Sequence, residues 1–166
     1  MTRYRAPAPP KSPYITAQGY QRLQKEDKSL WLKRREVTKA LAAAAAEGDR
    51  SENAEYIYRK KELREIDRRV RYLQVRLPKL KIIDQSPSNQ DQVYFAAWVT
   101  LEDNDGKQHI YRIVGPDEID QQKNYISIDS PLAISLLKRN IDDEVNIETP
   151  SGKLTYWITA VSYENE

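Results

Sequence analysis

Two long stretches of the chain repeat apolar side chains at heptad spacing, and this pattern constrains the fold more than any other feature. The first series contains Tyr20, Leu23, Asp27, Leu30, Arg34, Val37, Leu41 and Ala44. The second contains Tyr56, Arg59, Leu63, Ile66, Val70, Leu73 and Leu77. Alternating steps of three and four residues place these side chains on one face of a helix, where a second helix can pack. Each series therefore predicts one arm of a coiled coil.

Only a short segment separates the two series, so they are predicted to fold back as an antiparallel helical hairpin. Each arm of roughly 30 residues would be about 45 Å long at a rise of 1.5 Å per residue. Thr16 is a suitable N-cap for the first helix, Gly48 suits a left-handed position after its end, and Pro78 ends the second helix. Residues 1–13 are rich in proline and are expected to form an unstructured leader.

The predicted apex of the hairpin contains two carboxylates, Asp49 and Glu52. Because they lie three residues apart, they fit the N-cap and N3 positions of a capping box that opens the second helix. Glu52 also lies four residues before Tyr56, so it continues the seam beyond the end of the first helix and should face the open apex. Each carboxylate has a second oxygen available for a metal ion or a water. The pattern therefore permits both a capping role and a functional role.

Five cations of the second helix fall within an arc of about 100°, away from the apolar seam. They are Lys60, Lys61, Arg64, Arg68 and Arg71. Such a basic stripe can follow a phosphate backbone, so it predicts nucleic-acid binding. The alternative is a solvated helix face on which pairs such as Asp67 with Arg71 compensate part of the charge. Residues 1–81 contain 21 Lys and Arg against 10 Asp and Glu, and such pairs do not remove this surplus of +11.

Residues 82–166 have the opposite character, with 6 Lys and Arg against 15 Asp and Glu. Their apolar residues alternate with a period of two, which predicts short strands. The expected strands are Val93–Leu101, Ile110–Val114, Tyr125–Ile128, Val145–Ile147 and Leu154–Val161. With a turn at 103–106 and a short helix at 131–138, they form a small antiparallel sheet with one helix.

We therefore expect an α+β chain with three parts: the leader at 1–13, the coiled-coil hairpin at 14–81 and a sheet domain at 82–166. The sequence has neither a run of about 20 apolar residues nor the apolar core of a secretory signal. It contains no cysteine and one histidine, His109, which argues against a thiolate or histidine metal site. These features predict a soluble cytoplasmic protein that does not bind membranes. We expect a monomer, although no feature of the sequence excludes self-association.

Four segments resemble the bacterial Gre transcript cleavage factors, and the B type in particular. They are Gly48–Tyr56, Arg64–Leu73, Arg112–Gly115 and Tyr125–Pro131. The resemblance covers nearly everything from about Ile15 to the end of the chain. The leader before Pro13 looks like an addition to the family pattern.

The resemblance implies that the hairpin enters the secondary channel of RNA polymerase when the enzyme has backtracked and extruded its RNA 3′ end. Asp49 and Glu52 would then help the polymerase's own active centre hydrolyse the transcript, which rescues arrested elongation. They would hold Mg²⁺ jointly with the polymerase, and the free protein should bind Mg²⁺ weakly because two exposed carboxylates do not make a cage. The chain would be an accessory factor rather than an enzyme. Arg50, Ser51 and Asn53 would be further tip contacts.

By the same resemblance, the basic stripe would hold the extruded RNA through its charge, and Asp129, Ser130 and Pro131 would meet the polymerase at the channel rim. The sheet domain would be FKBP-like, without isomerase activity, because function has to be argued from a site rather than from a fold. The alternative is a non-catalytic channel regulator or an RNA-binding coiled coil, in which the tip acids are only helix caps.

Overall fold

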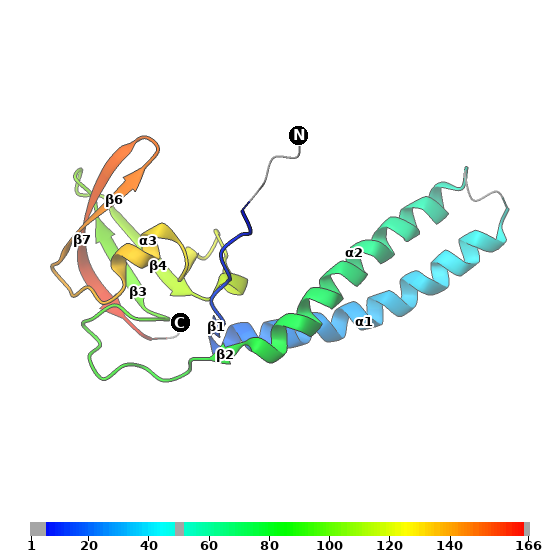
Figure 1. Cartoon of the computed structure of the whole chain (residues 1–166), viewed down its shortest axis with the longest axis horizontal. Helices are drawn as coiled ribbons and strands as arrows, with labels where there is room; N and C mark the ends of the chain where they lie inside the picture. Colours follow the sequence, from blue (N-terminus) through cyan, green and yellow to red (C-terminus); the bar gives the residue numbers. More distant parts are fainter. Residues whose placement is uncertain (1–5, 49–51, 165–166) are drawn as a thin grey trace. The chain divides into compact units, whose positions relative to one another are not determined.

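The computed structural model describes residues 6–48 and 52–164, which fall into two compact units (Figure 1). The hairpin unit consists of residues 18–80, and the sheet unit combines residues 6–17 with 81–164. The hairpin was predicted to include residues 14–17, but these residues pack in the sheet unit. The reason is a pair of short strands, in which β1 (Tyr14–Ile15) runs parallel to β2 (Lys81–Ile82).

The hairpin unit contains two long helices, α1 (Ala17–Ala46) and α2 (Ala54–Arg76), followed by the 3₁₀ turn η1 (Leu77–Lys79). Every residue of the two predicted heptad series is buried or half-buried, which confirms the seam. Its centre is a cluster of Val37, Ile66 and Val70, against which Leu30 and Leu63 pack. Because a coiled-coil seam buries side chains from both helices, the hairpin is stabilised mainly by this apolar contact.

Ion pairs join the two helices beside the seam. Both carboxylate oxygens of Glu26 accept hydrogen bonds from Arg69, at 2.6 and 3.0 Å. Asp67 accepts a hydrogen bond of 2.7 Å from Arg34, so the predicted pairing of Asp67 with Arg71 is wrong. The carboxylate of Asp67 points across the hairpin rather than along its own helix. Such partly exposed pairs contribute about 0.2–1 kcal/mol each, so they add little to the stability from the seam.

The sheet unit is built on five strands in the order β5-β4-β3-β7-β6. Their bounds are β3 Trp98–Glu102, β4 Gln108–Val114, β5 Tyr125–Ser127, β6 Glu144–Thr149 and β7 Gly152–Ser162. The sheet is antiparallel except for β5, which runs parallel to β4. The connection between these two strands contains the 3₁₀ turn η2 (Pro116–Glu118), and the short helix α3 (Pro131–Leu136) follows β5.

One predicted strand is shorter than its alternating pattern. The expected strand from Val93 begins only at Trp98, because Ala96 has a φ of 70° in a turn. Val93 and Ala97 are nevertheless fully buried. The alternating apolar pattern of residues 93–101 therefore predicted which side chains are buried, but it did not predict where the strand begins. With Val99, Leu101 and others they form the core of the sheet unit, in which α3 contributes Ala133 and Leu136.

The predicted turn at 103–106 is present and is closed by the side chain of Asp103. Its Oδ1 accepts hydrogen bonds from the backbone N–H groups of Asp105 and Lys107, both at 2.9 Å. Its Oδ2 lies 2.9 Å from Nε2 of His109, whose ring packs edge-on against Tyr156. The hydrogen bond with His109, helped by the backbone donors, lowers the pKa of Asp103. His109 is therefore a packed histidine of β4 that contacts the turn.

A buried carboxylate joins the N-terminal segment to η2. Glu118 is 3% exposed, and it accepts hydrogen bonds from the N–H of Gly115 at 2.8 Å and the N–H of Thr16 at 3.1 Å. The hydroxyl of Thr16 donates a further hydrogen bond to the same carboxylate. Thr16 directly precedes α1, as predicted. A buried charge is tolerated here because several donors replace its water.

We expect Tyr163→Phe to destabilise the sheet unit by about 1–3 kcal/mol, because both partners of a partly buried hydroxyl lose their hydrogen bond. Tyr163 accepts from the N–H of Tyr94 at 2.8 Å and donates to the carbonyl of Gln92. Burial raises the pKa of Tyr163, which means that the folded chain favours the neutral hydroxyl. The neutral Tyr163 hydroxyl therefore stabilises the fold at every pH below the ordinary tyrosine pKa. This stabilisation is lost as the pH rises through the raised pKa of Tyr163 in the folded chain.

Urea unfolding followed by tryptophan fluorescence measures this effect at neutral pH and above pH 10. Tyr58→Phe is a suitable control, because Tyr58 is 59% exposed on α2. Equal unfolding midpoints for Tyr163→Phe and the wild type would contradict the role of the hydroxyl.

Candidate functional site at the hairpin tip and along helix α2

The tip begins two residues after the end of α1. Gly48 has a φ of 130°, a region that favours glycine, as its predicted position required. Asp49, Arg50 and Ser51 lie outside the described residues, so the role assigned to Asp49 stays a prediction. Glu52 is described and exposed, two residues before the start of α2.

The N-cap of α2 is Asn53, so the predicted capping box of Asp49 and Glu52 is wrong. Oδ1 of Asn53 accepts a hydrogen bond of 3.0 Å from the N–H of Tyr56. Its Nδ2 donates a hydrogen bond of 2.8 Å to the carbonyl of Ala44, near the end of α1. One amide thus caps the second helix and ties it to the first. Because the helix starts at Ala54, Glu52 precedes the cap and cannot occupy N3.

This arrangement leaves Glu52 without a capping role. Its carboxylate makes no ion pair or hydrogen bond with any residue in the ranges 6–48 and 52–164. It lies beside the amino end of α2, where aligned peptide dipoles favour a negative charge. Within those same ranges, which exclude Asp49, no group of three potential ligands could hold a metal ion.

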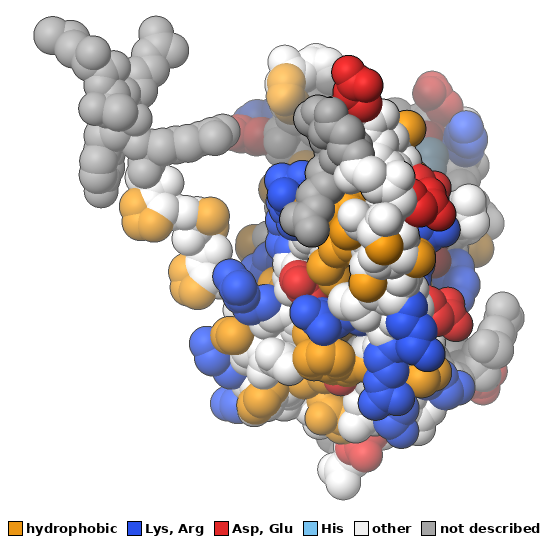
Figure 2. All heavy atoms as spheres, turned by 90° about the vertical axis from the view of Figure 1, so that its right-hand side faces the viewer, with side chains coloured by type: hydrophobic (Ala, Val, Ile, Leu, Met, Phe, Trp, Pro, Cys, Tyr) orange, Lys and Arg blue, Asp and Glu red, His pale blue; other side chains and the backbone are white. Residues whose placement is uncertain are grey.

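All five residues of the predicted basic stripe are exposed. None of them forms an ion pair with a residue that the structure describes, and two acids of the same helix, Glu55 and Glu62, pair with other cations. Glu62 lies 3.0 Å from Arg59 and 3.6 Å from Lys33, and Glu55 lies 2.8 Å from Arg59. In Figure 2, Lys and Arg side chains gather in groups in the lower half of the view, beside exposed apolar side chains. The five cations of the stripe thus lie outside the ion pairs that Glu55 and Glu62 form with Arg59 and Lys33.

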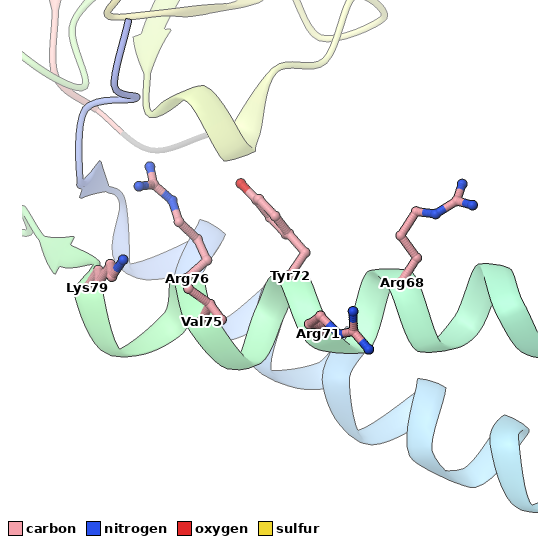
Figure 3. Close-up of a pocket in the computed structure, with 6 residues that line it drawn as sticks. All are labelled: Arg68, Arg71, Tyr72, Val75, Arg76 and Lys79. Carbon is pink, nitrogen blue, oxygen red and sulfur yellow. The ribbon is translucent and has the colours of Figure 1, made fainter. Parts of the chain in front are cut away.

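A shallow hollow of about 340 Å³ continues the stripe toward the carboxyl end of α2 (Figure 3). It is lined by Arg68, Arg71, Tyr72, Val75, Arg76 and Lys79. Arg68, Tyr72 and Arg76 follow each other at steps of four residues and extend from the same side of the helix in Figure 3. The stripe predicted from the sequence ended at Arg71 and did not include Arg76. Arg76 could have been found from the sequence, because it continues the steps of four residues from Arg68 to Tyr72. The hollow combines cations with an apolar floor.

The three predicted docking residues lie together where α3 begins. Asp129 is exposed, and its N–H donates a hydrogen bond of 3.0 Å to the hydroxyl of Ser127. Ser130 is the N-cap of α3, since its hydroxyl accepts a hydrogen bond of 3.2 Å from the N–H of Ala133. Pro131 is the first residue of the helix and is exposed. The turn therefore presents Asp129 and Pro131 on its surface.

Two family models together match nearly the whole chain. The model described as the N-terminal domain of transcription elongation factors matches residues 13–82, and the model described as the C-terminal domain of transcription elongation factors GreA/GreB matches residues 87–163. The chain belongs to the GreA/GreB family.

Among the helices that the structure describes in residues 6–48 and 52–164, none combines the length and the apolar character that a membrane span requires.

Individual members of the GreA/GreB family are similar to the chain over almost its full length. It is 53% identical to transcription elongation factor GreB of Pseudomonas aeruginosa, with 98% of both chains covered. It is 54% identical to GreB of Yersinia pestis, over 92% of this chain and 90% of the relative. GreB of Xanthomonas axonopodis pv. citri is also 54% identical, with 98% of both chains covered. These relatives confirm the resemblance to the B type. Because two of them align with 98% of this chain, the expectation that the leader before Pro13 is an addition to the family pattern is wrong.

Proposed function

We propose that this chain is an elongation factor that inserts its hairpin into the secondary channel of RNA polymerase and stimulates cleavage of the 3′ RNA in backtracked complexes. Membership of the GreA/GreB family supports an action on transcript elongation. The observation that carries the catalytic part of the proposal is the exposed carboxylate of Glu52, which stands outside the cap of α2. An acid at the end of a long hairpin is suited to act inside another molecule's active site.

Asp49 and Glu52 would hold Mg²⁺ together with the polymerase. The donor set fits this ion, because Mg²⁺ prefers oxygen ligands and is commonly bound by one or two carboxylates with substrate phosphates and waters. When bound, the ion would orient and acidify the water that attacks the phosphodiester. Both side chains would supply negative charge, and Asn53 fixes the start of α2 next to Glu52. The chain would thus be an accessory factor that completes the polymerase's site.

The basic stripe would hold the extruded RNA. Its cations are exposed and form no ion pair with a described residue, so their charge remains available for phosphates. Because the contacts are electrostatic, they would not select a base sequence. At the other unit, Asp129, Ser130 and Pro131 would meet the polymerase at the channel rim, and the capping bond of Ser130 would hold that turn in shape.

Transcript cleavage in a stalled, backtracked polymerase complex tests the proposal. We expect the chain to accelerate cleavage, and an unchanged rate would contradict the proposed function. The stripe variant Lys60→Ala/Arg64→Ala/Arg68→Ala should bind such a complex more weakly. Its binding should depend less on salt, by about 2 in the slope of log affinity against log salt concentration, because three phosphate contacts are lost.

A matched triple variant of α1 controls for net charge. Arg22→Ala/Lys25→Ala/Lys28→Ala removes the same charge from exposed positions of the other helix. We expect this variant to keep the salt slope of the wild type. An equal loss in both triple variants would show that the total charge, rather than the stripe, attracts RNA.

A further inference from the structure

The N-terminal segment contacts the predicted docking residue Asp129 directly. The N–H of Ser12 donates a hydrogen bond of 2.9 Å to Oδ2 of Asp129, and its hydroxyl donates another to Oδ1. The two residues lie 117 positions apart in the sequence and within the same unit. Ser12 was predicted to lie in an unstructured leader, but it donates hydrogen bonds to both carboxylate oxygens of the exposed Asp129.

Ser12 is held in place by the strand that follows it. The carbonyl of Pro13 accepts a hydrogen bond of 2.8 Å from the N–H of Lys81. Tyr14 and Ile15 then pair with β2, and Ile15 is fully buried. The backbone of Pro13, the residue next to Ser12, is therefore fixed to the sheet unit.

The backbone of Asp129 is equally well fixed. Its N–H bonds to the Ser127 hydroxyl at 3.0 Å, and the N–H of Ser130 bonds to the Ser127 carbonyl at 2.9 Å. The N–H of Ile128 donates to the carbonyl of Val114 at 2.7 Å, which ties the turn to β4. The backbones of Ser12 and Asp129 are therefore both fixed by hydrogen bonds of their own segments. The contact with Ser12 restricts rotation of the Asp129 side chain, which the turn by itself does not restrict.

We infer that Ser12 is a positioning residue for docking on RNA polymerase, an inference that rests on the proposed function, in which Asp129 contacts the polymerase. A carboxylate has about four lone-pair sites, so the two donors of Ser12 leave others for a partner. Because Asp129 is exposed, those sites remain accessible. A side chain already held in one rotamer loses less conformational entropy on binding. The segment around Ser12 and the turn at 129–131 thus form a single docking surface.

The test compares the affinities of full-length variants for RNA polymerase. Ser12→Ala removes the hydroxyl donor but keeps the N–H donor to Oδ2, so it releases Asp129 only in part and is expected to bind about two- to fourfold more weakly. Ser12→Thr keeps the hydroxyl and should bind like the wild type. Asp129→Asn should bind more weakly, and adding Ser12→Ala to it should cause little further loss, because Ser12 acts through Asp129.

Ser86→Ala is a matched control, because Ser86 is an exposed serine that also precedes a proline. It should not change the affinity. Equal losses for Ser12→Ala and Ser12→Thr, or a tighter complex with Ser12→Ala, would overturn the inference. So would full additivity of Ser12→Ala and Asp129→Asn.

The experiment also separates this inference from the proposed function. If Asp129→Asn weakens binding and Ser12→Ala does not, the docking role of Asp129 stands and the role of Ser12 is wrong. If Asp129→Asn binds like the wild type, the docking assignment fails and the role of Ser12 fails with it. Cleavage that persists in that case would leave the catalytic role of the tip intact.

Discussion

Replacing Glu52 with glutamine is expected to slow stimulated transcript cleavage by about 10²-fold or more, while the affinity for RNA polymerase stays close to that of the wild type. Glutamine has nearly the same shape, but its neutral amide cannot balance the charge of Mg²⁺ or hold the attacking water as a carboxylate does. Asp49→Asn should have the same effect for the same reason. Cleavage rates in a backtracked complex, measured at saturating concentrations of each variant, separate the chemical step from binding.

Because Asn53 and not Glu52 caps α2, the test can separate a loss of cleavage from a loss of stability. Because Asn53 accepts the hydrogen bond from Tyr56, Glu52→Gln should change the free energy of unfolding by less than about 0.5 kcal/mol. Asn53→Ala should instead cost about 1 kcal/mol, since it removes the cap. Glu55→Gln is a matched control, because Glu55 is an exposed acid of the first turn that pairs with Arg59 at 2.8 Å. It should retain cleavage.

The alternative function predicts the opposite result. If the chain is a non-catalytic channel regulator or an RNA-binding coiled coil, Glu52→Gln and Asp49→Asn would leave transcript cleavage unchanged. That outcome would remove the catalytic role proposed for the tip. A loss of cleavage that occurs only together with a loss of polymerase binding would also contradict it.

Gly115→Ala is expected to destabilise the sheet unit by about 3 kcal/mol or more. A Cβ at this position would lie 2.0 Å from the carbonyl oxygen of Tyr14 and 3.1 Å from Oε2 of Glu118. The first neighbour is backbone, so the overlap can be relieved only by moving β1 away from η2. That movement would also break the hydrogen bond that the N–H of Thr16 donates to the buried carboxylate of Glu118.

Urea unfolding followed by the fluorescence of Trp98 and Trp157 measures this effect. Gly152→Ala provides the comparison, because Gly152 has a φ of 124° but no atom within 4 Å of an added Cβ. It should cost about 1 kcal/mol through backbone strain alone. If Gly115→Ala proves no more harmful than Gly152→Ala, the close approach of β1 to residue 115 does not contribute to stability as proposed.

Local patterns explain why much of the fold could be predicted. The heptad spacing depends only on neighbours three and four residues away, so it located the seam of α1 and α2 correctly. The same holds for the positive φ of Gly48 and the turn closed by Asp103, because each depends on a few adjacent residues. The family resemblance added the functional meaning of the tip acids, which spacing by itself left open between capping and chemistry.

The cap of α2 shows where local reasoning reached its limit. Asp49, Ser51 and Asn53 are all good N-cap residues, and the sequence does not choose among them. The choice of Asn53 depends on its second hydrogen bond, to Ala44 at the end of α1, which exists only after the two helices have packed. The same is true of Asp67, whose partner Arg34 lies on the opposite helix.

The sequence by itself determined the hairpin, its apolar seam, its exposed cations and the acidic residues of its tip, because periodicity and residue chemistry act over a few positions. Only the tertiary structure decided that Glu52 is free of the cap, that Thr16 and Glu118 meet across 102 positions, and that Ser12 holds Asp129. Such contacts join residues far apart in the chain, and they leave no periodic pattern because chain folding, not spacing, brings the two partners together.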